Sequence, residues 1–291
     1  MPNAIELFKS YVTLLDEVYK LASLSSDLDG APELARQGAN VNELIIPILE
    51  MAGLADYSRN DGYVNGDVTL RNETVKCNFD RGRLFTVDNL DNAESAGIAF
   101  GRLASEFIRT KVVPELDAFR FAQYAQKENI STIDASDLTT GAKVVEALRA
   151  ANNQMDEDEV PYNDRHLKIT PTLLGLIEDL DTTKSKKVLE SFASITKVPQ
   201  TRFYTKIQQF NGKTEGQTAG GYKKADDGQN INFLIVHKPA VIQHQKHIAP
   251  KVITPEQNQN ADAWKFGYRN VGIADVYENK LAGIYLHKAT I

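Results

Sequence analysis

Residues 67–88 read DVTLRNETVKCNFDRGRLFTVD, and this stretch decides the fold. Val75, Cys77 and Phe79 alternate with polar residues, which is the two-residue period of a half-buried strand. The dipeptide Arg81-Gly82 predicts a turn, so the stretch is expected to fold as a two-stranded ribbon. A hairpin with one apolar face is at best marginally stable in water on its own. We therefore expect a neighbouring copy of the same chain to cover that face.

The composition is that of an ordinary globular protein. The chain has 291 residues, of which 42% are hydrophobic and 25% charged, enough for one large or two modest domains. It carries 33 basic and 39 acidic residues, so its formal net charge is −6. A protein whose main task is to grip nucleic acid needs clustered basic residues, and this balance argues against that class. It fits a surface that nucleic acid touches only loosely.

The chain gives no sign of export or of membrane insertion. Cys77 is the single cysteine, which excludes an internal disulfide framework. The first fifteen residues lack a basic region, a long apolar core and a small-residue cleavage site. No stretch approaches the roughly 20 apolar residues that span a bilayer. We expect synthesis in the cytoplasm and no membrane partner.

A long helix follows the ribbon, which is expected over residues 57–88. Asp91 or Asn92 is predicted to cap the helix, with Glu94 in the first turn, where the helix dipole favours an acid. An apolar stripe then continues for roughly 30 residues, a length on the order of 45 Å. Pro114 lies in the middle and is expected to kink or divide the helix.

The rest of the chain mixes helices and strands, which predicts an α+β fold. Residues 4–25 have helical periodicity, and residues 31–44 are expected to form an extended arm. Residues 239–291 return to strand-like alternation, after a glycine-rich loop over 211–230. Between these parts we expect helices over 141–152, 170–180 and 185–194, and strands over 167–169, 201–208 and 231–236.

Three short motifs suggest ligand sites, and none carries the residues that such a site needs. The GKT at 212–214 resembles the end of a phosphate-binding loop, but Ile207 stands where that motif needs glycine. His244 and His247 would lie on opposite faces of a strand, without a cysteine or acid to complete a metal site. The acidic run 155–159 lacks the turning glycine of a calcium loop. We therefore predict no catalytic residue, cofactor or metal, and a protein that is not an enzyme.

Several motifs occur in an order that resembles a known family. They are DRGRxFxVD from Asp80, DxxE from Asp91, VPELDA from Val113, VPQTRF from Val198, the strand 231–237 leading to KxA, WKFxYR from Trp264 and NKxxGIY from Asn279. From about residue 40 onward, the chain resembles the major capsid (coat) proteins of tailed bacteriophages. Encapsulin shells and the herpesvirus capsid floor share the fold of that family.

The resemblance implies a division of the chain into the parts of the phage major capsid protein fold. An extended β-hairpin loop would lie across an adjacent subunit, a peripheral domain would carry the long spine helix, and an axial domain would pack around five-fold and six-fold centres. The implied boundaries are 1–40 for the N-terminal helix and arm, 41–90 for the extended loop, 91–137 with 239–274 for the peripheral domain, and 138–238 with 275–291 for the axial domain.

The implied function is that of a major capsid protein, a structural protein of the virion. Copies of the chain would self-assemble as hexamers and pentamers into the icosahedral head shell of a tailed bacteriophage and enclose its double-stranded DNA. The chain starts at Met1 without a spare domain, so a separate scaffolding protein is expected, together with a portal. An encapsulin-like compartment shell, and a monomeric enzyme or binding module, stay open as alternatives.

Five residues are predicted to make contacts between subunits. They are Arg81, Gly82, Arg83, Phe85 and Glu94. The two arginines are expected to pair with acidic groups of the next subunit, because a guanidinium binds a carboxylate through two parallel hydrogen bonds.

Overall fold

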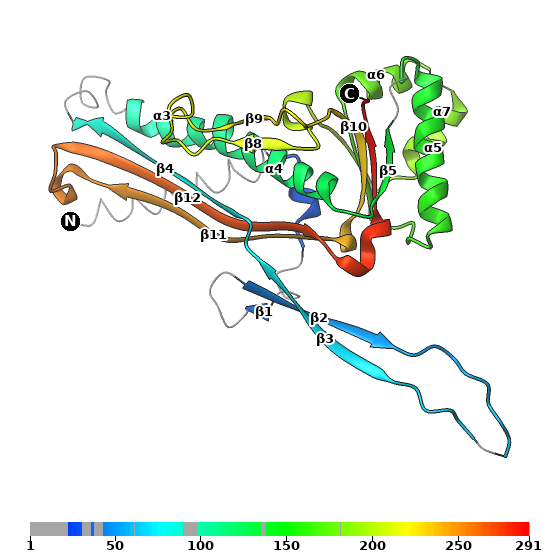
Figure 1. Ribbon diagram of the computed structural model, residues 1–291. Helices are drawn as coiled ribbons and strands as arrows, with labels where there is room; N and C mark the ends of the chain where they lie inside the picture. Colours follow the sequence, from blue (N-terminus) through cyan, green and yellow to red (C-terminus); the bar gives the residue numbers. More distant parts are fainter. Residues whose placement is uncertain are drawn as a thin grey trace.

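The computed structural model describes residues 23–30, 36–37, 43–60, 62–89, 98–134, 138–180 and 182–290. Figure 1 shows an elongated body and a two-stranded hairpin that projects away from it. Most of the helix predicted over 4–25 lies outside the described residues. The predicted helix start, with Asp91, Asn92 and Glu94, lies outside them as well.

One half of the body is a long antiparallel sheet covered by the spine helix (Figure 1). The sheet has the order β11-β12-β4, with β4 at Phe79–Asp88, β11 at Val241–Ile253 and β12 at Ala263–Val276. Alternate residues of β4 turn their side chains to the helix: the Phe79 ring lies 5.0 Å from that of Phe119, and the Phe85 ring 4.7 Å from that of Phe107. These contacts form part of the larger apolar core.

The predicted turn at Arg81-Gly82 is wrong, because both residues lie inside β4. Arg81 pairs with Asn270 and Gly82 pairs with Arg269, both on β12. A Cβ atom on Gly82 would lie 2.8 Å from the carbonyl oxygen of Tyr268. Glycine therefore allows β12 to approach closely here, and the chain does not reverse.

The ribbon exists, but its strands differ from those predicted. β2 (Glu43–Met51) and β3 (Val68–Lys76) form an antiparallel hairpin, and the short β1 (Arg36–Gln37) pairs with β2. The partner of β3 is therefore the strand before it in the chain, and the residues after Cys77 belong to the body.

The spine helix changes its hydrogen-bond ladder before Pro114. It consists of α3 (Ile98–Phe107), a π-turn (Ile108–Val112) and α4 (Val113–Gln126), which continue as one rod in Figure 1. In the π-turn the N–H of Val113 donates to the carbonyl of Ile108, five residues back. Pro114 has no N–H to donate, so a normal α-helical ladder is interrupted here. The predicted division of the helix takes the form of this π-turn.

The other half of the body is a five-stranded sheet with a second apolar core. Its strand order is β5-β13-β10-β6-β7, and three helices lie together beside it (Figure 1). The bounds are β5 Ser131–Asp134, β6 Arg165–Ile169, β7 Ser194–Lys197, β10 Ile231–His237, β13 Ile284–Lys288, α5 Gly141–Glu157, α6 Pro171–Glu178 and α7 Thr183–Glu190.

The three helices follow the sequence prediction, with ends shifted by a few residues. Thr140 caps α5 by accepting from the N–H of Lys143, and Thr182 forms a capping box with Ser185 on α7. The predicted α+β class is confirmed.

Short elements connect these parts. The strand predicted over 201–208 is wrong for most of its length, because residues 200–202 form a 3₁₀-helix (η4, Gln200–Arg202) and only the last two residues enter β8. β8 (Ile207–Gln209) and β9 (Tyr222–Lys224) make a small hairpin along the spine (Figure 1). The remaining 3₁₀-helices are η1 Ser26–Leu28, η5 Lys238–Ala240, η6 Pro255–Gln257 and η7 Glu278–Gly283.

Candidate assembly surfaces

The projecting hairpin exposes a row of large apolar side chains. Leu54 is fully exposed at 108% and Tyr63 is 88% exposed, in the segment that links β2 to β3. The full set on the hairpin is Leu49, Met51, Leu54, Tyr57, Tyr63, Val64, Val68 and Leu70. Most large exposed apolar side chains of the described residues therefore lie on this one element, and such a patch marks a contact surface.

The hairpin is ordered within itself at its tip. Ser58 and Gly62 form an isolated β-bridge, and the rings of Tyr57 and Tyr63 pack with their centroids 4.9 Å apart. Gly62 has a φ of 78°, a conformation that glycine adopts without strain. These contacts join the two sides of the hairpin near its tip.

The base of the hairpin is fixed to the body. Val75 is buried with Ile242 and Ile273 on the face of the long sheet opposite the spine. At the junction with β4, the Asn78 side chain donates to the carbonyl of Ala274 at 2.8 Å and accepts from its N–H at 3.1 Å. The hairpin therefore has a firm root and an uncovered outer part.

The two arginines predicted as subunit contacts have partners within the chain. Arg81 donates from Nε to Glu115 on α4 at 2.8 Å and from Nη2 to the carbonyl of Phe210 at 2.8 Å. Arg83 donates to the carbonyl of Thr218 at 3.1 Å. Both side chains thus tie the segment between β8 and β9 to β4, across the spine.

The other predicted contact residues are placed as follows. Gly82 lies against β12, and Phe85 packs edge-on against Phe107 of the spine. Glu94 lies outside the described residues. A role of the five residues between subunits stays a prediction.

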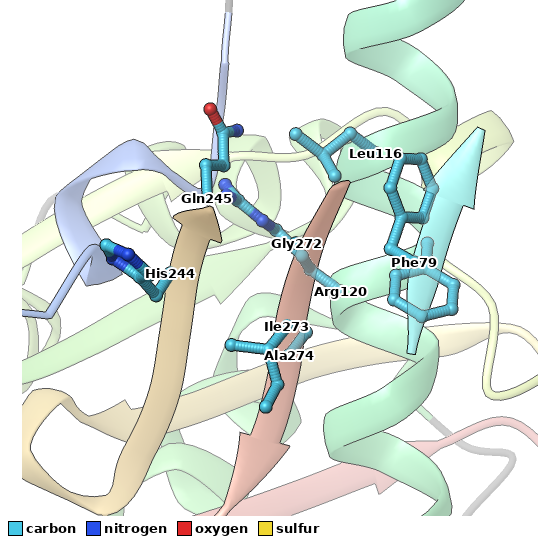
Figure 2. Close-up of a pocket in the computed structure, with 9 residues that line it drawn as sticks. Phe79, Leu116, Arg120, His244, Gln245, Gly272, Ile273 and Ala274 are labelled. Atoms are coloured by element: carbon cyan, nitrogen blue, oxygen red, sulfur yellow. The ribbon is translucent and has the colours of Figure 1, made fainter. Parts of the chain in front are cut away.

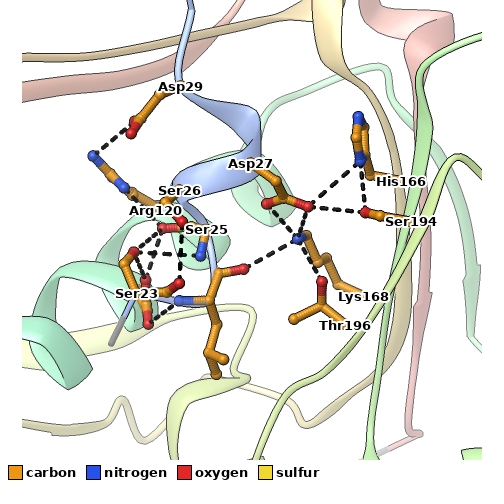
Figure 3. A network of polar contacts seen from close by, with 12 residues as sticks. Ser23, Ser25, Ser26, Asp27, Asp29, Arg120, His166, Lys168, Ser194 and Thr196 are labelled. Carbon is orange, nitrogen blue, oxygen red and sulfur yellow. Dashed lines mark hydrogen bonds and ion pairs between the residues drawn. The ribbon is translucent and has the colours of Figure 1, made fainter. Parts of the chain in front are cut away.

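A buried polar network, which the sequence did not reveal, anchors residues 23–30 to the body (Figure 3). Lys168 on β6 is 0% exposed, and its Nζ lies 2.6 Å from both carboxylate oxygens of Asp27. It also donates to Oγ1 of Thr196 on β7 at 3.0 Å. Asp27 accepts a further hydrogen bond from Ser194 at 3.0 Å. The Asp27 carboxylate therefore balances the charge of the Lys168 ammonium group, which is hydrogen-bonded inside the body.

Asp117 on the spine holds the start of the same segment. Its carboxylate, on a residue that is 0% exposed, accepts from Ser23 Oγ at 2.9 Å, Leu24 N–H at 3.0 Å and Ser25 Oγ at 2.7 Å. Arg202 donates to it as well, at 3.2 Å. This one carboxylate thus joins the N-terminal segment, the spine helix and η4.

Arg120 and Gln243 complete the anchor. Arg120 donates to Ser25 Oγ at 2.8 Å and to Asp29 at 3.4 Å. Gln243 on β11 donates to Asp29 at 2.7 Å and to the carbonyl of Ser25 at 2.6 Å, and it accepts from Tyr124 OH at 2.6 Å. Residues 23–30 are therefore pinned to both halves of the body.

Burial and pairing set the protonation of the network. Burial raises the pKa of Asp27, but the hydrogen bond with His166 and the charge of Lys168 outweigh it, so the pKa lies well below its usual value. Burial lowers the pKa of Lys168, and the Asp27 carboxylate opposes that shift. Burial also raises the pKa of Tyr124 far above its usual value. The network is built around the ion pair of Asp27 and Lys168.

One hollow in the described part of the chain is too small for a ligand. Figure 2 shows a hollow between β4, α4, β11 and β12, whose lining combines apolar residues with Arg120, His244 and Gln245. It has no space for a water molecule. Among the described residues, no group of three or more metal-binding side chains is placed to hold an ion. No described helix is long and apolar enough to cross a membrane.

Comparison with known proteins gives a likeness of structure only. Neither a protein-family model nor a curated protein sequence matches the chain. The virus-like particle from Pyrococcus furiosus is similar with a TM-score of 0.62 at 12% identity, over 97% of this chain and 99% of that one. The capsid of the cyanophage P-SCSP1u gives 0.57 at 14% identity, over 92% and 88%. The capsid of Staphylococcus phage Andhra gives 0.55 at 11%, over 89% and 84%. The chain has the fold of the subunits that build phage capsids and a virus-like particle.

Proposed function

We propose that the chain is a major capsid protein that self-assembles into the icosahedral head shell of a tailed double-stranded DNA bacteriophage. The observation that carries the proposal is the outer part of the hairpin, where the large apolar side chains from Leu49 to Leu70 given above are exposed. The shared fold with solved capsid subunits supports the same conclusion. The role is structural, without catalysis.

In the proposed shell, the outer part of the hairpin lies across an adjacent copy. Each large apolar side chain that becomes fully buried contributes about 1.5–3 kcal/mol. Association itself costs about 4–15 kcal/mol in lost freedom, so one hairpin gives a contact of modest net strength. Many such contacts, repeated by symmetry, hold a closed shell, while each of them alone stays reversible enough to correct errors.

The boundaries of the proposed parts follow the strand pairing. The extended loop ends at Lys76, since β4 pairs with β12 in the peripheral domain. The peripheral domain comprises the long sheet and the spine, and the axial domain comprises the five-stranded sheet with α5, α6 and α7. We place the axial domain around the five-fold and six-fold centres.

Further partners belong to the same proposal. A net charge of −6 suits a wall along which packaged DNA slides without sticking. A separate scaffolding protein would direct shell size, and a portal would occupy one vertex. The subunits would be made in the host cytoplasm and end in the virion.

A second candidate is an encapsulin-like compartment that encloses protein cargo. The virus-like particle from Pyrococcus furiosus, which is similar over 97% of this chain, has the same fold as the phage capsid subunits, so the fold alone does not separate the two candidates. The two candidates differ in what purified particles contain. Double-stranded DNA indicates the phage shell, and a bound enzyme indicates the compartment.

Electron microscopy of the full chain, expressed alone and with a candidate scaffolding protein, tests the proposal. We expect closed shells of uniform diameter in at least one sample. Monodisperse monomers of 32.3 kDa in both samples would contradict it. A variant with Leu54→Ser and Tyr63→Ser serves as the control, since it keeps the body intact and is expected to lose shells.

A further inference from the structure

The C-terminal end of α5 carries charges that the dipole of this helix does not favour. Asp156, Glu157 and Asp158 lie at this end, and no basic residue occupies the last turn. The C-terminal end of a helix has a partial negative charge, so acidic side chains there lower the stability of the helix. Asp156 is paired with Arg165 at 2.8 Å, whereas Glu157 is exposed. Glu157 therefore stands where the helix itself gains nothing from a carboxylate.

The N-terminal end of α7 shows the reverse. Its first turn contains Lys184 and no acidic residue, although a helix N-terminus has a partial positive charge. Lys187 follows three positions later on the same side of the helix, and both lysines are exposed. Proteins depart from such local preferences mainly at functional sites. The charges at the two helix ends therefore indicate a contact outside the helices that carry them.

The two charged ends are too far apart to meet within one subunit. α5 and α7 lie side by side at one end of the body (Figure 1), and Asn152 of α5 donates to Ser191, just after α7, at 2.9 Å. From this point α7 runs back along α5, whereas Glu157 lies beyond it in the other direction. With a rise of 1.5 Å per helical residue, Lys184 and Glu157 are separated by roughly 20 Å. Each charged end is thus free to contact another copy.

An exposed aromatic side chain lies next to the charged end of α5. Tyr162, in the loop that links α5 to β6, is 74% exposed. The guanidinium carbon of Arg165 lies 5.2 Å from the centre of the Tyr162 ring, and this arginine is 3% exposed and donates to two backbone carbonyls of the same loop. A tyrosine ring also attracts the ammonium group of a lysine and packs against its carbon chain. The surface called the acidic end from here on consists of Glu157, Glu159 and Tyr162.

We propose that the acidic end of one copy binds the first turns of α7, with Lys184 and Lys187, in the next copy. The contact brings together side chains of opposite charge, and it joins the negative end of one helix dipole to the positive end of another. Because its two surfaces differ, the contact repeats from copy to copy and closes into a ring when the rotation permits. This inference rests on the proposed function and adds which parts of the axial domain meet around the five-fold and six-fold centres.

Charge reversal in the full chain tests the contact. Glu157→Lys with Glu159→Lys makes both surfaces basic, and Lys184→Glu with Lys187→Glu makes both acidic. We expect each double variant to associate at least about tenfold more slowly than the parent at low salt, because like charges then face each other. The variant with all four substitutions carries the two charges in exchanged positions, and it should associate at the rate of the parent. Light scattering and sedimentation velocity record association, and electron microscopy records closed shells.

Two controls separate a lost contact from a damaged subunit. Glu157→Lys and Lys184→Glu both agree with the helix dipoles, so urea denaturation of dissociated subunits should give midpoints no lower than that of the parent. Asp226→Lys reverses the charge of an aspartate whose side chain is 96% exposed and which lies outside the contact, and it should associate as the parent does.

The outcomes distinguish the contact from the proposed function. Association of both double variants at the rate of the parent overturns the contact, and so does a folded variant with all four substitutions that does not regain association. A parent that forms open oligomers, which the double variants lose, but no closed shells contradicts the proposed function and supports the contact. A parent that does not associate at all overturns both.

Discussion

The body and the hairpin differ in which side chains they bury and which they expose to water. The body buries even charged groups such as Lys168 and Asp117, and it surrounds them with partners. The hairpin leaves Leu54 and Tyr63 exposed to solvent in the segment that links β2 to β3. The same chain thus pairs its buried charges in the body and leaves large apolar side chains uncovered on the hairpin. The difference indicates that the hairpin surface is completed by another molecule.

Removing core volume from the body should give the largest loss of stability. The ring of Phe121 is 0% exposed and packs edge-on against Phe203, with centroids 5.3 Å apart. Phe121→Ala is expected to lower the free energy of unfolding by about 3–5 kcal/mol. Urea denaturation of unassembled subunits measures it. Leu54→Ala is the matched control, with a change within about 0.5 kcal/mol, and equal losses in both variants would remove the contrast between body and hairpin.

Removing one buried charge from the anchor should cost less than a core ring. Asp117→Asn weakens the charge-assisted hydrogen bonds from Ser23, Ser25 and Arg202. We expect a loss of about 1.5–3 kcal/mol in the free energy of unfolding. The exposed Asp226→Asn should change it little, and a comparable loss there would show that the anchor has no special weight.

A methyl group added to a glycine should distinguish the two regions again. Gly82→Ala places a Cβ 2.8 Å from the Tyr268 carbonyl, so β4 and β12 must separate, at a cost of about 1–3 kcal/mol. A Cβ on Gly53, in the hairpin loop, meets no atom within 4 Å. Gly53→Ala is expected to be neutral or to stabilise by about 0.4–1 kcal/mol. Thermal unfolding of both variants measures the pair, and a neutral Gly82→Ala contradicts the strand pairing.

Low pH should reduce the free energy of unfolding of the subunit, because Asp27 becomes protonated. Its folded-state pKa is lowered, so its contribution to stability is fully present above the unfolded value of about 3.9 and falls away as pH drops below it. Urea denaturation at pH values from neutral to below the unfolded pKa measures this slope. In Asp27→Asn, that part of the slope should be missing. A variant with the same acid dependence as the parent shows that Asp27 does not titrate in this way.

Substitutions on the hairpin surface should have the smallest effect on the free energy of unfolding. Leu54→Ser with Tyr63→Ser is expected to change subunit stability by no more than about 0.5 kcal/mol per site, because both side chains are already exposed. The same variant should assemble poorly, which light scattering records. Normal assembly of this variant would show that the hairpin surface is not part of a contact between copies.

The sequence predicted strands around Val75 and Phe79 but not the strands that pair with them. The alternation around Val75 and Phe79 shows which side chains a strand buries, but it does not show which strand lies beside it. β4 pairs with β12, which lies far along the chain, and the sequence around β4 does not predict this partner or its register. The glycine at Gly82 was misread as a turn, because glycine marks both reversals and close approaches of backbone.

The anchor was missed for a different reason. Asp27 lies in a segment that resembles an ordinary loop, and its partner lies 141 positions away in the sequence. A signal was present in the predicted strand 167–169, where Lys168 stands between Leu167 and Ile169. Lysine is almost never fully buried unless it is paired, so a lysine in an apolar strand predicts an acid nearby. It does not say which acid, and only the fold supplies that choice.

The central claim is that a second copy of the chain covers the outer part of the hairpin. The most direct measurement is the rate of thiol labelling at Leu54→Cys in a Cys77→Ser background, compared between assembled particles and dissociated subunits. We expect labelling to slow on the order of tenfold or more on assembly, because the buried site must open before it reacts. Equal rates in particles and in free subunits would contradict the claim.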